Sequence, residues 1–95
     1  MKKKTNYKQP VELKKNAEQA ILETFGNNLK ALREKKNLSQ EGMAFISGLS
    51  RSYYSEIELG KRNVSLINIT KIAMALDVEI NKLLGINDMR KNFKG

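Results

Sequence analysis

The sequence predicts an all-α fold of five helices with one additional helix at the N-terminal end. Three serines, Ser39, Ser50 and Ser65, each precede a stretch of apolar residues at helical spacing. A serine hydroxyl in that position can accept hydrogen bonds from the free N–H groups of the first helical turn. Gly60 and Gly85 stand where two such stretches end, as glycine often does in the left-handed conformation after a helix. The chain carries no alternating apolar pattern of the kind that indicates a β-strand.

The additional helix is expected after a polar, basic start at residues 1–9. Pro10 suits the first turn of a helix, where its missing N–H costs nothing. Apolar residues then recur at spacings of three and four and form one stripe of an amphipathic helix: Leu13, Ala17, Ala20, Ile21 and Phe25. Gly26 and the two asparagines after it either break this helix or let it continue into the next one.

The first helix of the following domain is expected to run through Leu29 and to end near Asn37. Two short helices then begin at Ser39 and Ser50, with residues 46–49 as the turn between them. A turn of three to four residues is typical of a helix-turn-helix, which can place its second helix in the major groove of DNA.

Two further helices complete the predicted domain. The helix after Ser65 has an apolar face formed by Leu66, Ile69, Ile72, Ala73 and Leu76. A last short helix carries Ile80, Leu83 and Leu84. We therefore divide the chain into a basic N-terminal extension with an amphipathic helix (1–24), a helix-turn-helix domain (25–85) and a basic tail (86–95).

The chain has 18 basic and 10 acidic residues, and its net charge is +8. This balance suits a polyanionic partner, because phosphate contacts release condensed counterions, although it also serves solubility alone. The chain lacks histidine and cysteine, and no nucleophile–base pair or metal-ligand cluster appears, so we expect no enzyme, no metal and no cofactor. No apolar run approaches the ~20 residues of a membrane helix and no signal peptide is evident, which predicts a cytoplasmic protein without membrane contact.

Residues 25–85 also carry a group of residues typical of one large family. They are Phe25–Arg33, Leu38–Glu41, Ala44, Gly48, Ile57–Glu58, Gly60–Arg62 and Lys71–Leu76. On these residues the sequence resembles the phage-repressor-like helix-turn-helix family (Cro-type, XRE). Within that family, Gly48–Glu58 and Gly60–Leu66 are most similar to the controller proteins of restriction–modification systems.

This resemblance implies a sequence-specific transcriptional regulator that binds double-stranded DNA as a homodimer on a near-palindromic operator. A controller-like protein would regulate its own restriction–modification operon, as an activator at low occupancy and as a repressor once a second dimer binds. The alternatives are a phage-type repressor, an antitoxin that represses its operon and engages a protein partner through the N-terminal helix, and a module that bridges proteins without reading sequence.

The candidate recognition helix spans residues 51–59. Tyr54 and Ile57 face inward by helical period, and the outward residues are the candidate base contacts: Arg51, Ser52, Ser55 and Glu56. Arginine is unfavourable at a helix N-terminus, and bidentate binding of guanine would explain its presence there. Glu56 can accept a hydrogen bond from cytosine or repel phosphates at wrong sites. The resemblance implies base contact by Arg51 and Ser52, and a solvated helix face is the alternative.

The candidate phosphate contacts are Gln40, Tyr53, Lys61 and Asn63. Gln40 matches a family position on the phosphate backbone, beside free N–H groups of its helix, and a plain helix-start glutamine is the alternative. Tyr53 can stack on a sugar or donate its hydroxyl to a phosphate. The loop 61–63 should follow the backbone, and the resemblance adds base contact by Arg62, with a solvated charged loop as the alternative.

The resemblance also implies a structural pair and an interface. Arg33 and Glu58 match positions that form an ion pair between the first helix and the end of the recognition helix. Related regulators dimerise through the last helix, where apolar surface is offered by Ile80, Leu83 and Leu84. The N-terminal stripe is a second candidate interface, and a monomer with both surfaces packed on its own core is the alternative.

Overall fold

The computed structural model describes residues 8–14 and 16–85, so the tail predicted at 86–95 lies outside the described residues. Every regular element in the described part of the chain is a helix, as predicted. The helices are α1 (Ala17–Lys35), α2 (Gln40–Ser47), α3 (Arg51–Glu58), α4 (Leu66–Leu76) and α5 (Ile80–Leu84). None of them is long and apolar enough to cross a membrane.

The N-terminal stripe does not form a helix of its own: its residues from Ala17 to Phe25 belong to the first turns of α1, and Leu13 lies before the helix. The helix continues without interruption through Gly26, so the expected boundary at residue 25 falls inside α1. The predicted start at Pro10 is wrong, because α1 begins at Ala17. Ala17 is 6% exposed, whereas Val11 is 83% exposed. Short helices in water depend on burying an apolar face, and residues 8–14 are all exposed.

At Gly26 the backbones of α1 and α3 are in close contact. A Cβ atom at this position would lie 2.5 Å from the carbonyl oxygen of Glu58 and 2.6 Å from that of Ile57. Only glycine, with no side chain, allows the two backbones to approach so closely. This contact fixes the end of α3 against the middle of α1.

The three predicted serine caps are confirmed. The Oγ atoms of Ser39, Ser50 and Ser65 each accept a hydrogen bond from the backbone N–H three residues later, at 2.9, 3.2 and 3.1 Å. Each cap satisfies one of the N–H groups that a helix leaves without an intrahelical partner. The starts of α2, α3 and α4 are therefore set by local sequence.

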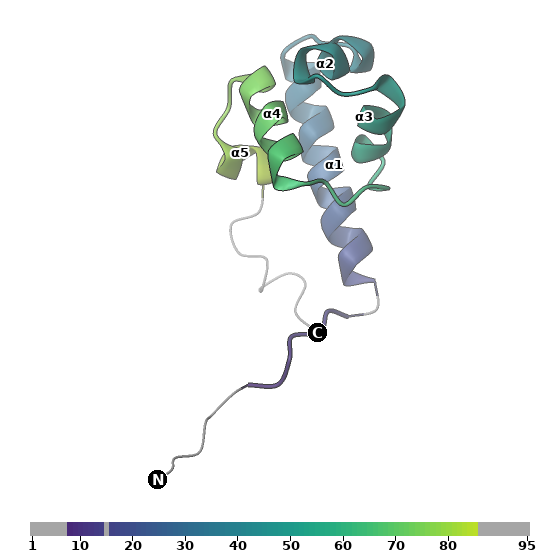
Figure 1. Ribbon diagram of the computed structural model, residues 1–95, viewed down its shortest axis with the longest axis vertical. Helices are drawn as coiled ribbons and strands as arrows, with labels where there is room; N and C mark the ends of the chain where they lie inside the picture. The colour runs from purple at the N-terminus through teal and green to yellow at the C-terminus, as the bar shows by residue number, and fades with distance from the viewer. Residues whose placement is uncertain (1–7, 15, 86–95) are drawn as a thin grey trace.

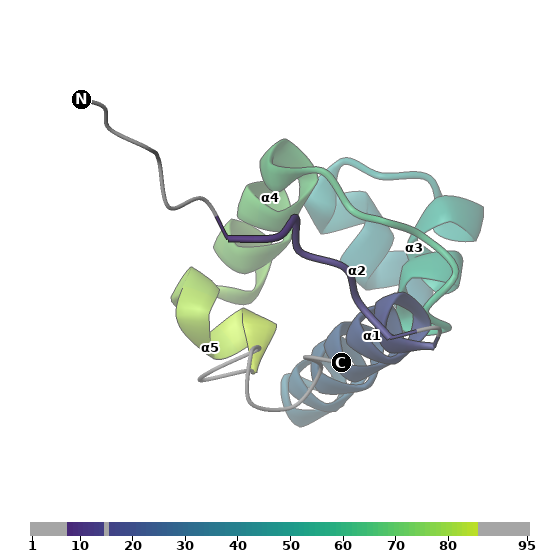
Figure 2. The same ribbon diagram turned by 90° about the horizontal axis from the view of Figure 1, so that it is seen from below.

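The helices form one bundle around α1. Helix α1 packs against α3 and α5, α2 packs against α3 and α4, and α4 packs against α5. In Figure 1, α3 lies on the opposite side of α1 from α5, and the view from below in Figure 2 shows the same separation. Helix α3, the candidate recognition helix, and the last helix α5 thus lie on different sides of the domain.

The core lies between the five helices and is formed by Phe25, Leu29, Met43, Ala44, Tyr54, Ile57, Ile72, Ala73, Leu76 and Leu83. The prediction that Leu66 belongs to the packed face of its helix is wrong, because this side chain is 71% exposed. Val64 and Ile69 pack against the core in this region. Ile67 and Met74 of the same helix are also exposed, at 67% and 76%.

Candidate nucleic-acid interface

Helices α2 and α3 and the three residues between them form the predicted helix-turn-helix. Gly48 ends α2 with a φ of 72°, in the left-handed region that favours glycine. The N–H of Leu49 donates to the carbonyl oxygen of Ala44 at 2.9 Å, and Ser50 then caps α3. The turn is therefore tied to the helix on either side, and α3 has a fixed orientation relative to α2.

One side of α3 is buried and the other is polar. Tyr54 and Ile57 are 0% and 1% exposed, as helical period predicts. The outward side chains are exposed in the first turn and half-buried in the second: Arg51, Ser52, Ser55 and Glu56. A polar hollow between α2 and α3 is lined by Gln40, Arg51, Ser52 and Ser55. This face can accept the edge of an extended polar ligand.

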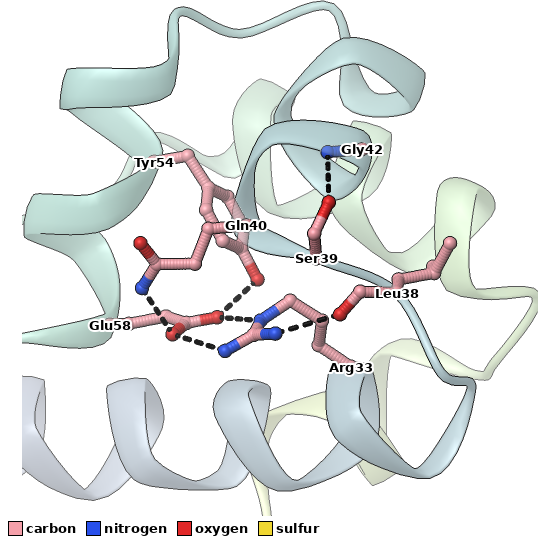
Figure 3. Close-up of polar contacts among 7 residues, drawn as sticks. All are labelled: Arg33, Leu38, Ser39, Gln40, Gly42, Tyr54 and Glu58. Atoms are coloured by element: carbon pink, nitrogen blue, oxygen red, sulfur yellow. Dashed lines mark hydrogen bonds and ion pairs between the residues drawn. The ribbon is translucent and has the colours of Figure 1, made fainter.

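The end of α3 is held by an ion pair between Arg33 of α1 and Glu58 (Figure 3). Arg33 Nε donates to Glu58 Oε2 at 2.6 Å, and Nη2 donates to Oε1 at 3.1 Å. The third arm of the guanidinium, Nη1, donates to the carbonyl oxygen of Leu38 at 2.7 Å. Arg33 is 8% exposed and Glu58 is 6% exposed, so the fork is buried. Bidentate geometry of this kind fixes orientation as well as charge.

Two further side chains donate to the same carboxylate, as Figure 3 also shows. The Tyr54 hydroxyl donates to Glu58 Oε2 at 2.6 Å, and Gln40 Nε2 donates to Oε1 at 2.9 Å. Glu58 therefore accepts hydrogen bonds from α1, α2 and its own helix. This set of residues, Arg33, Gln40, Tyr54 and Glu58, is called the Glu58 network below.

The Glu58 network shifts the pKa of each ionisable group in it. The hydrogen bond to Glu58 raises the pKa of the Arg33 guanidinium, although burial opposes the rise. Burial raises the pKa of the Tyr54 hydroxyl, and its bond to Glu58 adds to the rise. Burial alone would raise the pKa of the Glu58 carboxyl, but the donors from Arg33, Tyr54 and Gln40 outweigh burial and lower this pKa. At neutral pH the network is a charged pair beside a neutral phenol.

Gln40 is not a freely solvated side chain at a helix start, because it is half-buried and bound to Glu58. One N–H of its amide is used by Glu58, and the amide carries a second. The phosphate contact expected of Gln40 stays a prediction. Its role in the Glu58 network could not be read from the sequence, because it depends on how α2 packs against α3.

The loop after α3 carries the exposed residues Lys61, Arg62 and Asn63. Arg62 Nε donates to Glu56 Oε1 at 2.7 Å, so Glu56 faces a cation of the same chain. The guanidinium carbon of Arg62 lies 5.3 Å from the centre of the Tyr53 ring. The Tyr53 hydroxyl accepts a hydrogen bond from Asn68 Nδ2 at 3.1 Å. Sequence reasoning missed these contacts, which join residues of α3, the loop and α4.

The predicted dimer residues of α5 do not share one environment. Leu83 is 0% exposed and is part of the core of its own domain, so its predicted contact with a second copy is wrong. Ile80 is 37% exposed and Leu84 is half-buried. The sequence pattern identified an apolar helix but could not tell which residues its own domain covers.

Comparison with known proteins places this geometry in a family. The helix-turn-helix family model HTH_3 matches residues 29–83, more than half of the chain. The control protein C.MunI from a Mycoplasma species is 55% identical over 60 residues, which are 62% of this chain and 81% of that protein. The control protein C.BamHI from Bacillus amyloliquefaciens is 51% identical over 61 residues, 63% of this chain and 75% of that protein.

A solved structure agrees with the sequence comparison. The crystal structure of the restriction–modification controller protein C.AhdI from Aeromonas hydrophila superposes with a TM-score of 0.66 at 56% identity. The match covers 67% of this chain and 97% of that one. From the extent of the family match and the identity to these relatives, the chain belongs to the HTH_3 helix-turn-helix family.

Proposed function

We propose that the protein is a DNA-binding transcriptional regulator that acts as a homodimer on a near-palindromic operator. The observation that carries this proposal is the polar outer face of α3, held in place by the buried Glu58 network. A recognition helix reads bases only if its orientation is fixed, because each bidentate base contact depends on geometry. Relatives that are named control proteins share this part of the chain.

In this proposal the base contacts come from the first two turns of α3. Arg51 is exposed at the N-terminus of the helix, where its guanidinium can donate to O6 and N7 of guanine. Ser52 and Ser55 line the same polar hollow and can donate to or accept from a base edge. Lys61 and Asn63 are exposed in the loop after α3 and suit contacts with phosphates. The N-terminus of α2, with Gln40, adds a further phosphate contact.

The homodimer is proposed to form through the surface of α4 and α5. Ile80 and Leu84 retain exposure on α5, and Leu66 and Ile67 are exposed on α4, which packs against α5. Two copies related by a two-fold axis would present their recognition helices about 34 Å apart, one turn of DNA. Ile80→Asp should convert the dimer to a monomer in sedimentation equilibrium, whereas Phe45→Asp, at an exposed position of α2, should not. A dimer that survives Ile80→Asp would overturn this interface.

The regulated target is proposed to be the protein's own operon, in the manner of a restriction–modification controller. The support is the similarity to control proteins over most of the domain. We also propose a cytoplasmic location and no catalytic reaction, because the chain belongs to a helix-turn-helix family and its relatives are named control proteins. Activation at low occupancy and repression at high occupancy would follow if a second dimer binds a weaker adjacent site.

Operator binding is tested by titrating the protein onto DNA from upstream of its own gene at ~0.15 M salt, with a scrambled duplex as control. A true operator should bind at least ~10³-fold more tightly than the scrambled duplex. A stepwise, cooperative curve with that preference would support an autoregulating dimer. Equal, salt-sensitive binding to both duplexes would contradict the proposed function and favour a module that bridges proteins.

A protein partner at the N-terminal extension is a second proposal. A depression beside the first turns of α1 is lined by Leu13, Glu18, Ile21, Leu22 and Asn63. An antitoxin-like protein would engage its toxin through such a surface. Co-purification of a second small protein, lost in Leu13→Asp while operator binding is retained, would support this partner. Purification of the chain alone from cells that express the whole operon would contradict it.

A further inference from the structure

Arg62 folds back onto the recognition helix that precedes it. The chain reverses at Gly60, whose φ is 77°, and the N–H groups of Gly60 and Lys61 donate to the carbonyl oxygens of Ile57 and Glu56 at 3.0 and 2.9 Å. This pair of bonds is the Schellman arrangement, which satisfies the last carbonyl groups of a helix. Gln19 Nε2 of α1 also donates to the carbonyl oxygen of Gly60 at 3.0 Å. The backbone that carries Arg62 is therefore fixed relative to α3.

The guanidinium of Arg62 is then held on two sides. Its Nε donates to Glu56 Oε1 at 2.7 Å, and its carbon atom lies 5.3 Å from the centre of the Tyr53 ring, within the range of a cation–π contact. The ring itself is restrained, because its hydroxyl accepts a hydrogen bond from Asn68 of α4. Three residues from two helices thus determine where one arginine side chain lies.

The pairing leaves the binding end of Arg62 available. A guanidinium has five N–H donors, and Glu56 takes the single donor at Nε. The two terminal nitrogens carry the other four donors, and they make no hydrogen bond to any residue in the described part of the chain. The Arg62 side chain remains 51% exposed. An exposed ion pair contributes little to stability. The effect of the Arg62–Glu56 pair is therefore to orient the Arg62 guanidinium.

We propose that Glu56 and Tyr53 are positioning residues that hold Arg62 ready to bind the operator with both terminal nitrogens. The proposal rests on the proposed function and deepens it, and it replaces the predicted base contact of Glu56 and phosphate contact of Tyr53. Ordering an arginine before binding lowers the entropy that is lost when the complex forms. Glu56 therefore adds to operator affinity through Arg62 although its own charge is repelled by phosphates.

A double-mutant cycle tests this dependence. Operator and scrambled duplexes are titrated with the wild type, Glu56→Ala, Arg62→Ala and the double variant at the same salt concentration. Glu56→Ala should weaken operator binding by about 3- to 10-fold relative to the wild type. Its binding to the scrambled duplex should be as tight as that of the wild type or tighter. In the Arg62→Ala background, the same change should alter operator affinity by under about 2-fold. Glu56→Gln, which keeps an acceptor oxygen, should restore most of the affinity.

Two outcomes of the cycle would overturn the proposal. An equal loss in both backgrounds would mean that Glu56 contacts the DNA itself. Tighter binding of Glu56→Ala to both duplexes alike would mean that Glu56 acts only by repulsion. Glu34→Ala serves as the matched control, because it removes one exposed carboxylate from α1 and should leave the ratio of operator to scrambled affinity unchanged.

A measurement on the free protein separates this proposal from the proposed function. The Nε–H group of Arg62, observed by ¹⁵N NMR, should be ordered in the wild type and mobile in Glu56→Ala. Equal mobility in both would overturn the positioning role. A wild type that binds operator and scrambled DNA equally would refute the proposed function, and the NMR comparison would still decide whether Glu56 holds Arg62.

Discussion

Replacing Arg33 by alanine should strongly lower the melting temperature of the protein. The change removes three hydrogen bonds: two to Glu58, at 2.6 and 3.1 Å, and one to the carbonyl oxygen of Leu38, at 2.7 Å. It leaves the Glu58 carboxylate, which is 6% exposed, without its cation. A buried charge that loses its partner is strongly destabilising, because water cannot replace the lost interaction.

The size of the effect follows from what remains around Glu58. Breaking a buried ion pair costs about 3–5 kcal/mol, and the two donors still present, Tyr54 and Gln40, favour the lower end, about 3 kcal/mol. For a domain of this size each kcal/mol lowers the melting temperature by roughly 4–8 °C, which gives a decrease of about 12–24 °C. Operator affinity should decrease as well, because the end of α3 loses its anchor on α1.

The assay is thermal unfolding followed by circular dichroism, with affinity measured well below the melting temperature. Arg33→Lys should be intermediate, because an ammonium keeps the charge but not the bidentate geometry. Lys30→Ala, at an exposed position of the same helix, is the control for charge and helix composition and should melt close to the wild type. An unchanged melting temperature in Arg33→Ala would refute the reasoning that this pair is buried and stabilising.

The remaining predictions concern acid stability, base reading and helix contact. Because the pKa of Glu58 is lowered, its contribution to the folding stability is complete above the unfolded carboxyl pKa of about 4.3. This contribution is lost as the pH falls through the lower folded-state pKa. The stability difference between the wild type and Glu58→Gln should therefore narrow in acid, and a difference that is constant with pH would contradict this. Arg51→Ala should weaken operator binding and relax sequence preference, whereas Lys61→Ala should weaken binding to all duplexes alike; equal losses on operator and scrambled DNA for Arg51→Ala would remove its assigned role. Gly26→Ala should cost about 1–3 kcal/mol in urea unfolding, because the new Cβ would meet the backbone of α3, and the exposed Asn27→Ala should not.

The parts of the fold that depend on residues close together in the sequence could be predicted from it. Ser39, Ser50 and Ser65 each cap a helix through an N–H only three residues away, so the pattern of serine before an apolar stretch carries the information. The inward direction of Tyr54 and Ile57 follows from helical period in the same way. These features required no knowledge of how the helices pack.

Features that depend on packing could not be obtained in this way. Leu83 and Leu66 both belong to apolar helices, but one is covered by its own domain and the other is exposed. The contact between Glu56 and Arg62 depends on the chain reversal at Gly60. Helical period alone predicts that Glu56 faces outward, and it does not show that Arg62 folds back onto it. The spacing of Tyr54 and Glu58, four residues apart on one helix, was the signal available in the sequence for their hydrogen bond.

The Glu58 network also explains why stability and DNA reading should change together in this protein. One carboxylate accepts donors from α1 through Arg33, from α2 through Gln40 and from α3 through Tyr54. These are the helices that support, precede and form the proposed recognition surface. A conservative change such as Glu58→Gln would remove the charge that Arg33 requires and loosen all three helices from one another. We therefore expect variants of this network to lose operator specificity in proportion to their loss of stability, whereas variants of Arg51 should lose specificity without losing stability.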